Sequence, residues 1–267
     1  MRGIPPFLIM LLAGCVTPVE SPHGAPLVMV PINAPALPQA GDIAHYTVRN
    51  AYNGETVGDV EYRVDKIERD RVIVAVNPTS ANAGSPRTEV YAADGNWLRH
   101  PVSNHDQLID HEFAQPYPAY VFPLETGRAW SRRVNATNVA TGRARSVRVD
   151  GEVLGSERIT TPAGAFDTVK IRRRVYAGDW DGFLFETNIT EYEWYAPELG
   201  RPVRLERNST WQDTSRGMGR GGMFGFFNNN QTMRGDWYVF ELTSASKRGD
   251  LSGSVPATKP AVPAEPR

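Results

Sequence analysis

Apolar and charged side chains alternate in the stretch Val60-Glu61-Tyr62-Arg63-Val64. Successive side chains of a β-strand point to opposite faces of a sheet, so this pattern predicts a strand with one buried and one solvated face. Val72, Val74 and Val76 share one parity in the next segment, which follows the turn-like pair Arg69-Asp70. Both segments are therefore expected in an antiparallel sheet, where such half-buried strands are common.

The same alternation continues along the chain and predicts the fold class. Further strands are expected around Val169 and Ile171, Tyr192 and Trp194, Val203 and Leu205, and Tyr238, Phe240 and Leu242. Turn sequences separate them, namely Asn53-Gly54, Thr141-Gly142, Pro162-Ala163-Gly164 and Glu198-Leu199-Gly200. We expect a mainly β protein built from one or more curved antiparallel sheets, half-barrel or sandwich-like. Little helix is expected, and residues 104–113 are the best candidate for it.

The composition limits the classes of protein that need to be considered. The chain has 267 residues, 40% of them hydrophobic, which is enough to fill a core. The formal net charge of −1 argues against a general affinity for nucleic acid. Cys15 is the single cysteine, so no disulfide can form within the chain, and packing and sheet hydrogen bonds must supply its stability.

The N-terminus has the features of an export signal. A basic residue, Arg2, precedes a short apolar run that ends in Leu12-Ala13-Gly14-Cys15. A bilayer span needs about 20 apolar residues, so this run is too short to be a transmembrane anchor. The last four residues resemble the bacterial lipoprotein box, which implies that Cys15 carries acyl chains such as palmitate. The residue after Cys15 is Val16, whereas lipoproteins retained in the inner membrane usually carry Asp at this position. The resemblance therefore implies an outer-membrane lipoprotein facing the periplasm.

A conventional cleaved signal is the alternative interpretation of this leader. It would leave Cys15 as an unpaired thiol in an oxidising compartment, where a single Cys needs an explanation. Lipidation supplies that explanation.

Proline-rich segments flank the strand-forming part of the chain. We expect a signal peptide at residues 1–14, a tether at 15–40, a first β unit at 41–125, a second at 126–245 and a disordered tail at 246–267. At about 3.1 Å per residue, such a tether would reach roughly 80 Å. The two units show strands and turns in the same order, which is compatible with an internal duplication.

Two segments resemble phrases found in uncharacterised bacterial envelope β-proteins. They are Thr161-Pro162-Ala163-Gly164-Ala165-Phe166-Asp167-Thr168-Val169-Lys170-Ile171 and Trp194-Tyr195-Ala196-Pro197-Glu198-Leu199-Gly200. Phe122-Pro123-Leu124, with Gly127 and Trp130, fits the same pattern. Such proteins are similar in architecture to lipoprotein carriers of the LolA and LolB type, which implies a curved sheet with a concave apolar face. The resemblance implies no catalytic group.

Histidines and carboxylates are densest between residues 100 and 112. His100, His105 and His111 lie near Asp106, Asp110 and Glu112. Imidazole and carboxylate together suit zinc or another divalent ion, so His105, Asp106 and His111 are candidate ligands, and a helix would place Asp106 and Asp110 on one face. The spacing matches no established zinc motif, and a solvated polar segment explains it equally well.

A pair of glutamates and a set of arginines are candidates for a catalytic or recognition role. Glu191 and Glu193 share a strand face, as a glycosidase acid pair could, but solvated strand faces usually carry such acids. Residues 172–174 are three consecutive arginines, and Arg143, Arg145 and Arg148 precede them. Since acidic residues are plentiful, a solvated and partly paired surface is the favoured interpretation.

Residues 217–235 form the most unusual stretch, with three Met, three Phe and the tract Asn228-Asn229-Asn230. It is expected to lie within a long loop, 212–235, and either a mobile hairpin tip or a contact loop for a partner, lipid surface or apolar ligand would explain it. Met223, Phe224, Phe226 and Phe227 are the candidate contact residues. The thioethers could also hold Cu(I).

These observations together favour a lipid-anchored envelope protein without catalytic residues. It is expected to bind an apolar ligand or an envelope partner, and no cofactor or nucleic acid. A metal-dependent hydrolase using His100, His105 and His111, or a purely structural envelope lipoprotein, are the alternatives. An enclosed apolar pocket would favour ligand binding.

Overall fold

The computed structural model describes residues 24–104, 107–179, 185–213 and 231–247. These residues form one sheet of thirteen strands and one short 3₁₀-helix, η1 (Ala81–Ala83). The strands are β1 (Ala25–Leu27), β2 (Ile43–Asn50), β3 (Thr56–Glu68), β4 (Arg71–Pro78), β5 (Arg87–Ala92), β6 (Trp97–Asn104), β7 (Gln107–Tyr117), β8 (Ala129–Asn138), β9 (Ala144–Thr161), β10 (Gly164–Asp179), β11 (Phe185–Ala196), β12 (Arg201–Asp213) and β13 (Gln231–Ser246).

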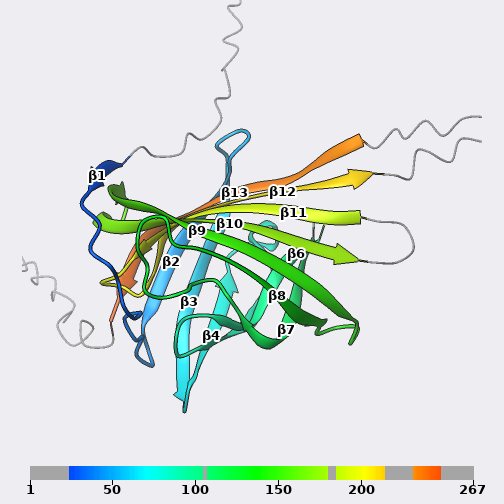
Figure 1. Ribbon diagram of the computed structural model, residues 1–267, viewed down its shortest axis with the longest axis horizontal. Helices are drawn as coiled ribbons and strands as arrows, with labels where there is room; N and C mark the ends of the chain where they lie inside the picture. The colour runs from blue at the N-terminus through cyan, green and yellow to red at the C-terminus, as the bar shows by residue number, and fades with distance from the viewer. Residues whose placement is uncertain (1–23, 105–106, 180–184, 214–230, 248–267) are drawn as a thin grey trace, which may run out of the picture.

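The sheet closes on itself, because β9 pairs with both β8 and β10. The order is β1-β9-β10-β11-β12-β13-β2-β3-β4-β5-β6-β7-β8, with β8 then returning to β9, and every pairing is antiparallel. The first half of β9 pairs with β8, and the second half pairs with β1. In Figure 1 the long strands β9 to β13 run across the view, while β2 to β4 lie at a steep angle to these strands. A curved, mainly β antiparallel fold is therefore confirmed.

The segments with alternating side chains form strands as predicted, and the predicted turn sequences connect these strands. Val60, Val64, Val72, Val74 and Val76 are all buried on β3 and β4. The Gly in three of the turns adopts a positive φ that other residues rarely take: Gly54 (73°), Gly142 (70°) and Gly200 (65°). Sequence alternation and turn chemistry therefore agree with the observed sheet.

Residues 104–113 do not form the predicted helix, and this prediction was wrong. Asn104 ends β6, and the residues from Gln107 onward belong to β7, which pairs with β6. Leu108 and Ile109 are successive strand residues, so their side chains point to opposite faces of the sheet rather than to one helical face.

The part of the predicted tether that the structure describes, residues 24–40, packs against the sheet. Ala25 pairs with Arg158 on β9, and Ile32 forms an antiparallel bridge with Leu124. The Ser156 hydroxyl lies 2.7 Å from the Met29 sulfur. The prediction of a free spacer was therefore wrong for this part. Proline-rich sequence suits a strap crossing a sheet edge as well as a spacer, because it needs few backbone partners.

One continuous sheet joins the two predicted β units. The β13–β2 and β7–β8 pairings connect residues 41–125 with residues 126–245. Residues 212–213 and 231–235, expected in a loop, instead extend β12 and β13, and residues 212–213 pair with residues 231–232. Similarity between the two units remains a prediction.

Candidate functional site: a cavity inside the closed sheet

A cavity of about 160 Å³ lies within the closed sheet. Its walls come from opposite sides of the ring: Tyr62 and Val74 lie on β3 and β4, whereas Tyr195 and Leu205 lie on β11 and β12. The other lining residues are Pro35, Ala36, Pro38, Tyr46, Val64, Val72, Tyr91, Ala92, Ala93, Gly95, Trp97, His100, Tyr120, Glu193, Gly200, Arg201, Pro202 and Phe240. The cavity therefore lies between strands of the ring, and it is partly open to solvent because the exposed Ala93 belongs to its lining.

Aromatic rings dominate the lining and contact one another. Tyr46 and Tyr62 pack edge to face with centroids 5.4 Å apart, and Tyr120 lies 5.1 Å from Tyr195. The Trp97 indole stacks on the His100 ring at 3.7 Å. Contacts of this kind stabilise the rings in fixed orientations, so the cavity has a defined shape.

One wall of the cavity ends on a buried ionic cluster. Arg173 on β10 is fully buried, and its guanidinium donates to Glu191 at 2.9 Å and to Glu193 at 2.5 Å. The second oxygen of Glu193 accepts from the Tyr120 hydroxyl at 2.5 Å. Arg173 also donates to the backbone carbonyl of Ala119 at 3.3 Å. Each charge in this cluster thus has a partner, as burial of charge requires.

A second ionic cluster lies on the opposite wall, around Glu89 of β5. Arg87 donates to one oxygen of this buried carboxylate at 2.7 Å. The other oxygen lies 2.9 Å from His100 Nδ1 and accepts a short hydrogen bond from Tyr91. Tyr62 lies within reach of Arg87 as well, at 3.4 Å. His100 and Tyr91 therefore line the cavity with His100 Nδ1 and the Tyr91 hydroxyl already engaged by Glu89.

Glu191 in the first cluster and Glu89 in the second are held in the ionised form. Burial alone would raise the pKa of Glu191, but Arg173 and then Arg207 outweigh burial and hold that pKa below its usual value. Burial would likewise raise the pKa of Glu89, yet His100 and Arg87 hold it well below its usual value. Carboxylates so held are poor general acids, so the clusters are suited to maintaining cavity shape rather than to proton transfer.

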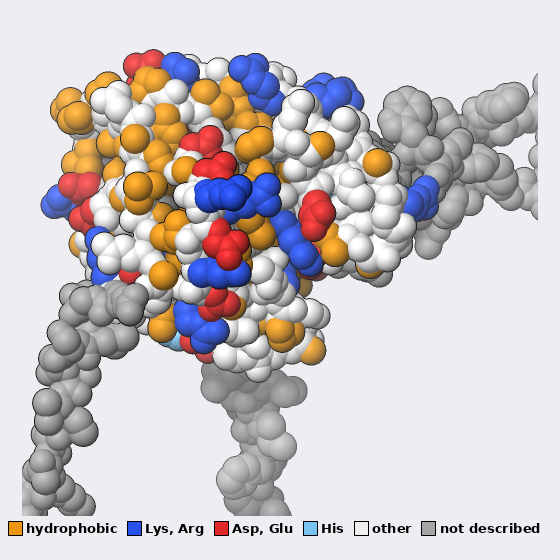
Figure 2. Space-filling model, turned by 90° about the horizontal axis from the view of Figure 1, so that it is seen from below, with side chains coloured by type: hydrophobic (Ala, Val, Ile, Leu, Met, Phe, Trp, Pro, Cys, Tyr) orange, Lys and Arg blue, Asp and Glu red, His pale blue; other side chains and the backbone are white. Residues whose placement is uncertain are grey.

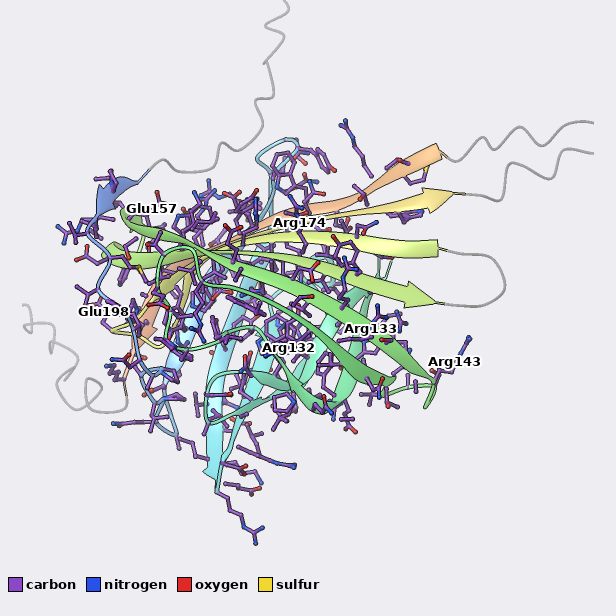
Figure 3. The ribbon with its side chains drawn as sticks, in the orientation of Figure 1. Arg132, Arg133, Arg143, Glu157, Arg174 and Glu198 are labelled. Atoms are coloured by element: carbon purple, nitrogen blue, oxygen red, sulfur yellow. The ribbon has the colours of Figure 1, made fainter. Side chains whose placement is uncertain are left out.

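The strap formed by residues 24–40 borders the cavity. Pro35, Ala36 and Pro38 belong to its lining, and Ala36 sits directly against Gly200 in the turn between β11 and β12. Figure 3 labels Glu198 in this same turn, at the end of the sheet opposite to that of Arg143. The N-terminal segment thus forms part of the cavity wall at the Glu198 end.

A second, more polar space of about 800 Å³ lies toward the Arg143 end of the sheet. Its lining includes η1 and the turn between β8 and β9, with Arg207, Asp236 and Tyr238. Phe240 lines both spaces, with the Arg207 guanidinium 5.4 Å from its ring centroid. Phe240 therefore lies between the apolar cavity and the polar space.

The structure separates the predicted metal ligands. His105 and Asp106 lie outside the described residues. His100 pairs with Glu89 as above, whereas His111 is buried with Nδ1 2.6 Å from the Ile109 carbonyl oxygen. Across residues 24–104, 107–179, 185–213 and 231–247, no group of three or more His, Cys, Asp or Glu could hold a metal ion. Cys15 and the candidate contact residues Met223, Phe224, Phe226 and Phe227 also lie outside the described part.

The prediction that Glu191 and Glu193 are solvated was wrong, as was the same prediction for Arg173. The neighbouring Arg172 fits the prediction, since it pairs with Glu152 at the surface. Figure 2 shows an outer face on which acidic and basic side chains alternate in this way. Arg173 shares the parity of the buried Ile171 and Val175, which is the signal in the sequence that could have identified it as an interior residue.

One family of known proteins matches the part of the chain that contains the Arg173 cluster. The DUF3108-like family matches residues 131–211, which include Arg173, Glu191 and Glu193. No curated protein matches the chain. Among the described residues, no helix has the length and apolarity needed to cross a membrane.

Three solved structures are similar to the chain. A candidate lipoprotein from Parabacteroides distasonis is 17% identical, with 80% of this chain and 99% of that chain covered and a TM-score of 0.46. An exported-protein candidate with a YmcC-like fold from Bacteroides fragilis is 19% identical, with 82% and 100% covered and a TM-score of 0.43. The hypothetical lipoprotein YmcC from Escherichia coli is 10% identical, with 76% and 84% covered and a TM-score of 0.35.

Proposed function

We propose that this chain is a lipid-anchored, non-catalytic binding protein of the bacterial envelope that holds a small apolar molecule inside its closed sheet. The observation that carries the proposal is the aromatic-lined cavity of about 160 Å³. A purely structural protein would be expected to fill such a space with side chains, since protein interiors are close-packed.

The dimensions of the cavity indicate the size of the ligand. An engineered apolar cavity of roughly 150 Å³ binds benzene or xenon, so the present cavity suits a molecule built on a single ring. Ligand sites are usually concave and mainly apolar, with a few placed polar groups. Tyr195 could supply such a group here, because the Tyr120 hydroxyl and the Glu193 carboxylate are engaged with each other.

The lipid anchor supports a site of action at the membrane surface. Cys15 precedes Ala25, the first residue of β1, by ten residues, which an extended chain spans in at most about 35 Å. The roughly 80 Å expected of a free tether is therefore too long. The strap that begins at β1 leads into the cavity wall, so lipidation at Cys15 would keep the ligand site close to the membrane. Val16 supports the outer membrane, with the folded part in the periplasm.

The ionic clusters support a binding role over a catalytic one. Both oxygens of Glu193 are engaged, by Arg173 and Tyr120, and both oxygens of Glu89 are engaged as well. A carboxylate that acts as general acid or base needs an oxygen free for the substrate. The clusters instead stiffen the walls around the apolar space.

Fluorine NMR with para-fluoroethylbenzene tests the proposal on the lipidated full chain in detergent. Ala93 is exposed in the turn at the cavity edge, so Ala93→Trp should block the cavity without burying a new side chain in the core. Ala144→Trp places the same indole at an exposed position outside the lining and controls for partition into detergent. We expect saturable binding in the wild type and in Ala144→Trp, and its loss in Ala93→Trp.

Equal binding by all three proteins, or saturable binding by none, would overturn the proposal. Near-ultraviolet circular dichroism of Ala93→Trp establishes that the variant is folded. Leu205→Phe, which narrows the same cavity from β12, should weaken binding as an independent variant.

A further inference from the structure

Tyr195 is a buried cavity residue whose hydroxyl has no acceptor among the residues that the structure describes. Its side chain, on β11, is only 1% exposed and lines the cavity. Within the described part of the chain, the Tyr195 oxygen makes no hydrogen bond of standard geometry. The backbone N–H of Ala36 approaches that oxygen, but an N–H group is a donor and cannot accept the hydroxyl proton.

The other tyrosines around the cavity are already engaged. The Tyr46 hydroxyl donates to the Pro202 carbonyl at 2.7 Å, Tyr120 donates to Glu193, and Tyr91 donates to Glu89. Tyr62 accepts from Arg87. Buried polar groups in folded proteins almost always have a partner, so the unmatched hydroxyl of Tyr195 marks the position where the cavity can recognise a polar atom.

The surroundings of Tyr195 define which polar atom fits. The hydroxyl stays protonated, because burial and then the nearby Glu193 charge raise its pKa, so it acts as a donor. Glu193 would repel an anionic ligand at this position. Arg201, the cation in the lining, is engaged with Tyr46. A neutral acceptor such as a carbonyl oxygen therefore suits the site better than a carboxylate.

We propose that the ligand is a small aromatic or similarly apolar molecule with one neutral carbonyl-type acceptor, which accepts a hydrogen bond from Tyr195. This inference rests on the proposed function, since it assigns the ligand class of the same cavity. It adds a specificity-determining residue that the apolar lining alone would not supply.

The test compares two probes of nearly equal shape, para-fluoroacetophenone and para-fluoroethylbenzene, by fluorine NMR titration of the full chain. One hydrogen bond to an otherwise unmatched buried donor should favour the ketone by about tenfold in the wild type. Tyr195→Phe should reduce that preference to about onefold to twofold while leaving the affinity for the hydrocarbon unchanged. Tyr52 lies outside the cavity lining, and its hydroxyl donates to the Gly235 carbonyl at 3.1 Å. The control variant Tyr52→Phe should therefore keep the preference for the ketone.

The outcomes separate this inference from the proposed function. If para-fluoroethylbenzene does not bind the wild type, the proposed function fails. If it binds but the ketone shows no advantage, or keeps its advantage in Tyr195→Phe, the role of Tyr195 is overturned. Binding of para-fluorobenzoate as tight as that of the ketone would overturn the preference for a neutral acceptor.

Discussion

Arg173 and Glu193 form a fully buried ion pair in which the guanidinium Nη2 lies 2.5 Å from the carboxylate Oε2. The two residues belong to adjacent strands, β10 and β11, and Glu193 also lines the cavity. The pair therefore connects the packing of the sheet with the shape of the site. Because Arg173 reaches Glu191 as well, its guanidinium pairs with two buried carboxylates.

Arg173→Met should destabilise the protein strongly. The substitution leaves Glu191 and Glu193 buried without their shared partner, and breaking a buried pair in this way costs about 3–5 kcal/mol. Urea unfolding at neutral pH measures the effect. Arg174→Met, at the adjacent exposed position, should change the free energy of unfolding by less than about 0.5 kcal/mol. Equal effects of the two substitutions would contradict the buried cluster.

Stability should fall on acidification, with a contribution from Glu89. Its pKa in the folded protein lies below the value of 4.5 typical of an unperturbed Glu, so its contribution is complete above about pH 4.5 and is lost as the pH falls further. Glu89→Gln should therefore be less stable than the wild type by about 1–3 kcal/mol at about pH 6, and the difference should shrink towards about pH 3.

Urea unfolding across this pH range checks the Glu89 prediction. Glu68→Gln removes an exposed carboxylate and serves as the control, with a small difference at every pH. A difference between Glu89→Gln and the wild type that stays constant down to about pH 3 would refute the assignment.

Gly151 should not tolerate a side chain, because Trp130 occupies the space beside it. A Cβ at residue 151 would lie 2.1 Å from the Trp130 ring, and that ring is held by its own hydrogen bond to the Pro118 carbonyl at 3.0 Å. Gly151→Ala should therefore cost about 1–3 kcal/mol through overpacking. The double variant Gly151→Ala/Trp130→Leu should be destabilised by less than the sum of the two single variants in a double-mutant cycle, whereas strict additivity would argue against the contact.

Gly200→Ala should loosen the strap at the cavity wall. A Cβ there would lie 2.4 Å from the Ala36 carbonyl oxygen, so the strap must move. Hydrogen exchange of amides such as that of Ile32, which donates to Leu124 at 3.0 Å, should become faster. Gly142→Ala is a matched control, since Gly142 has a similar positive φ but open space around its Cβ. Unchanged protection of the strap in Gly200→Ala would show that its contact with Gly200 does not hold it.

The strands were predictable because the period of two is a local signal, as Val60 to Val64 illustrates. The ionic interior was not, because the burial of Glu191 and Glu193 depends on a register that places Arg173 opposite Glu191 on the neighbouring strand. The alternation of residues along a strand shows which side chains share a face of the sheet. It does not show whether that face packs against other strands or contacts solvent. The hairpin of β6 and β7 was missed for a related reason: Leu108 and Ile109 suggested one helical face, whereas strand pairing separates them.

The cavity itself could not be predicted, because its lining comes from residues far apart in the sequence. Ala36, Val74 and Leu205 meet only once the sheet has closed through β8 and β9. The expectation of an apolar binding site came from the resemblance to carriers with a concave sheet. No pattern in the sequence predicted that the Tyr195 hydroxyl lies in the cavity.

The most direct measurement is a crystal structure of the chain soaked with bromobenzene, using the anomalous signal of bromine to locate the ligand. The account predicts a bromine peak inside the closed sheet, surrounded by Tyr46, Trp97 and Phe240. The Ala93→Trp variant should lack that peak. A peak found only on the outer surface, or no interior peak at saturating ligand, would contradict a binding cavity at this place.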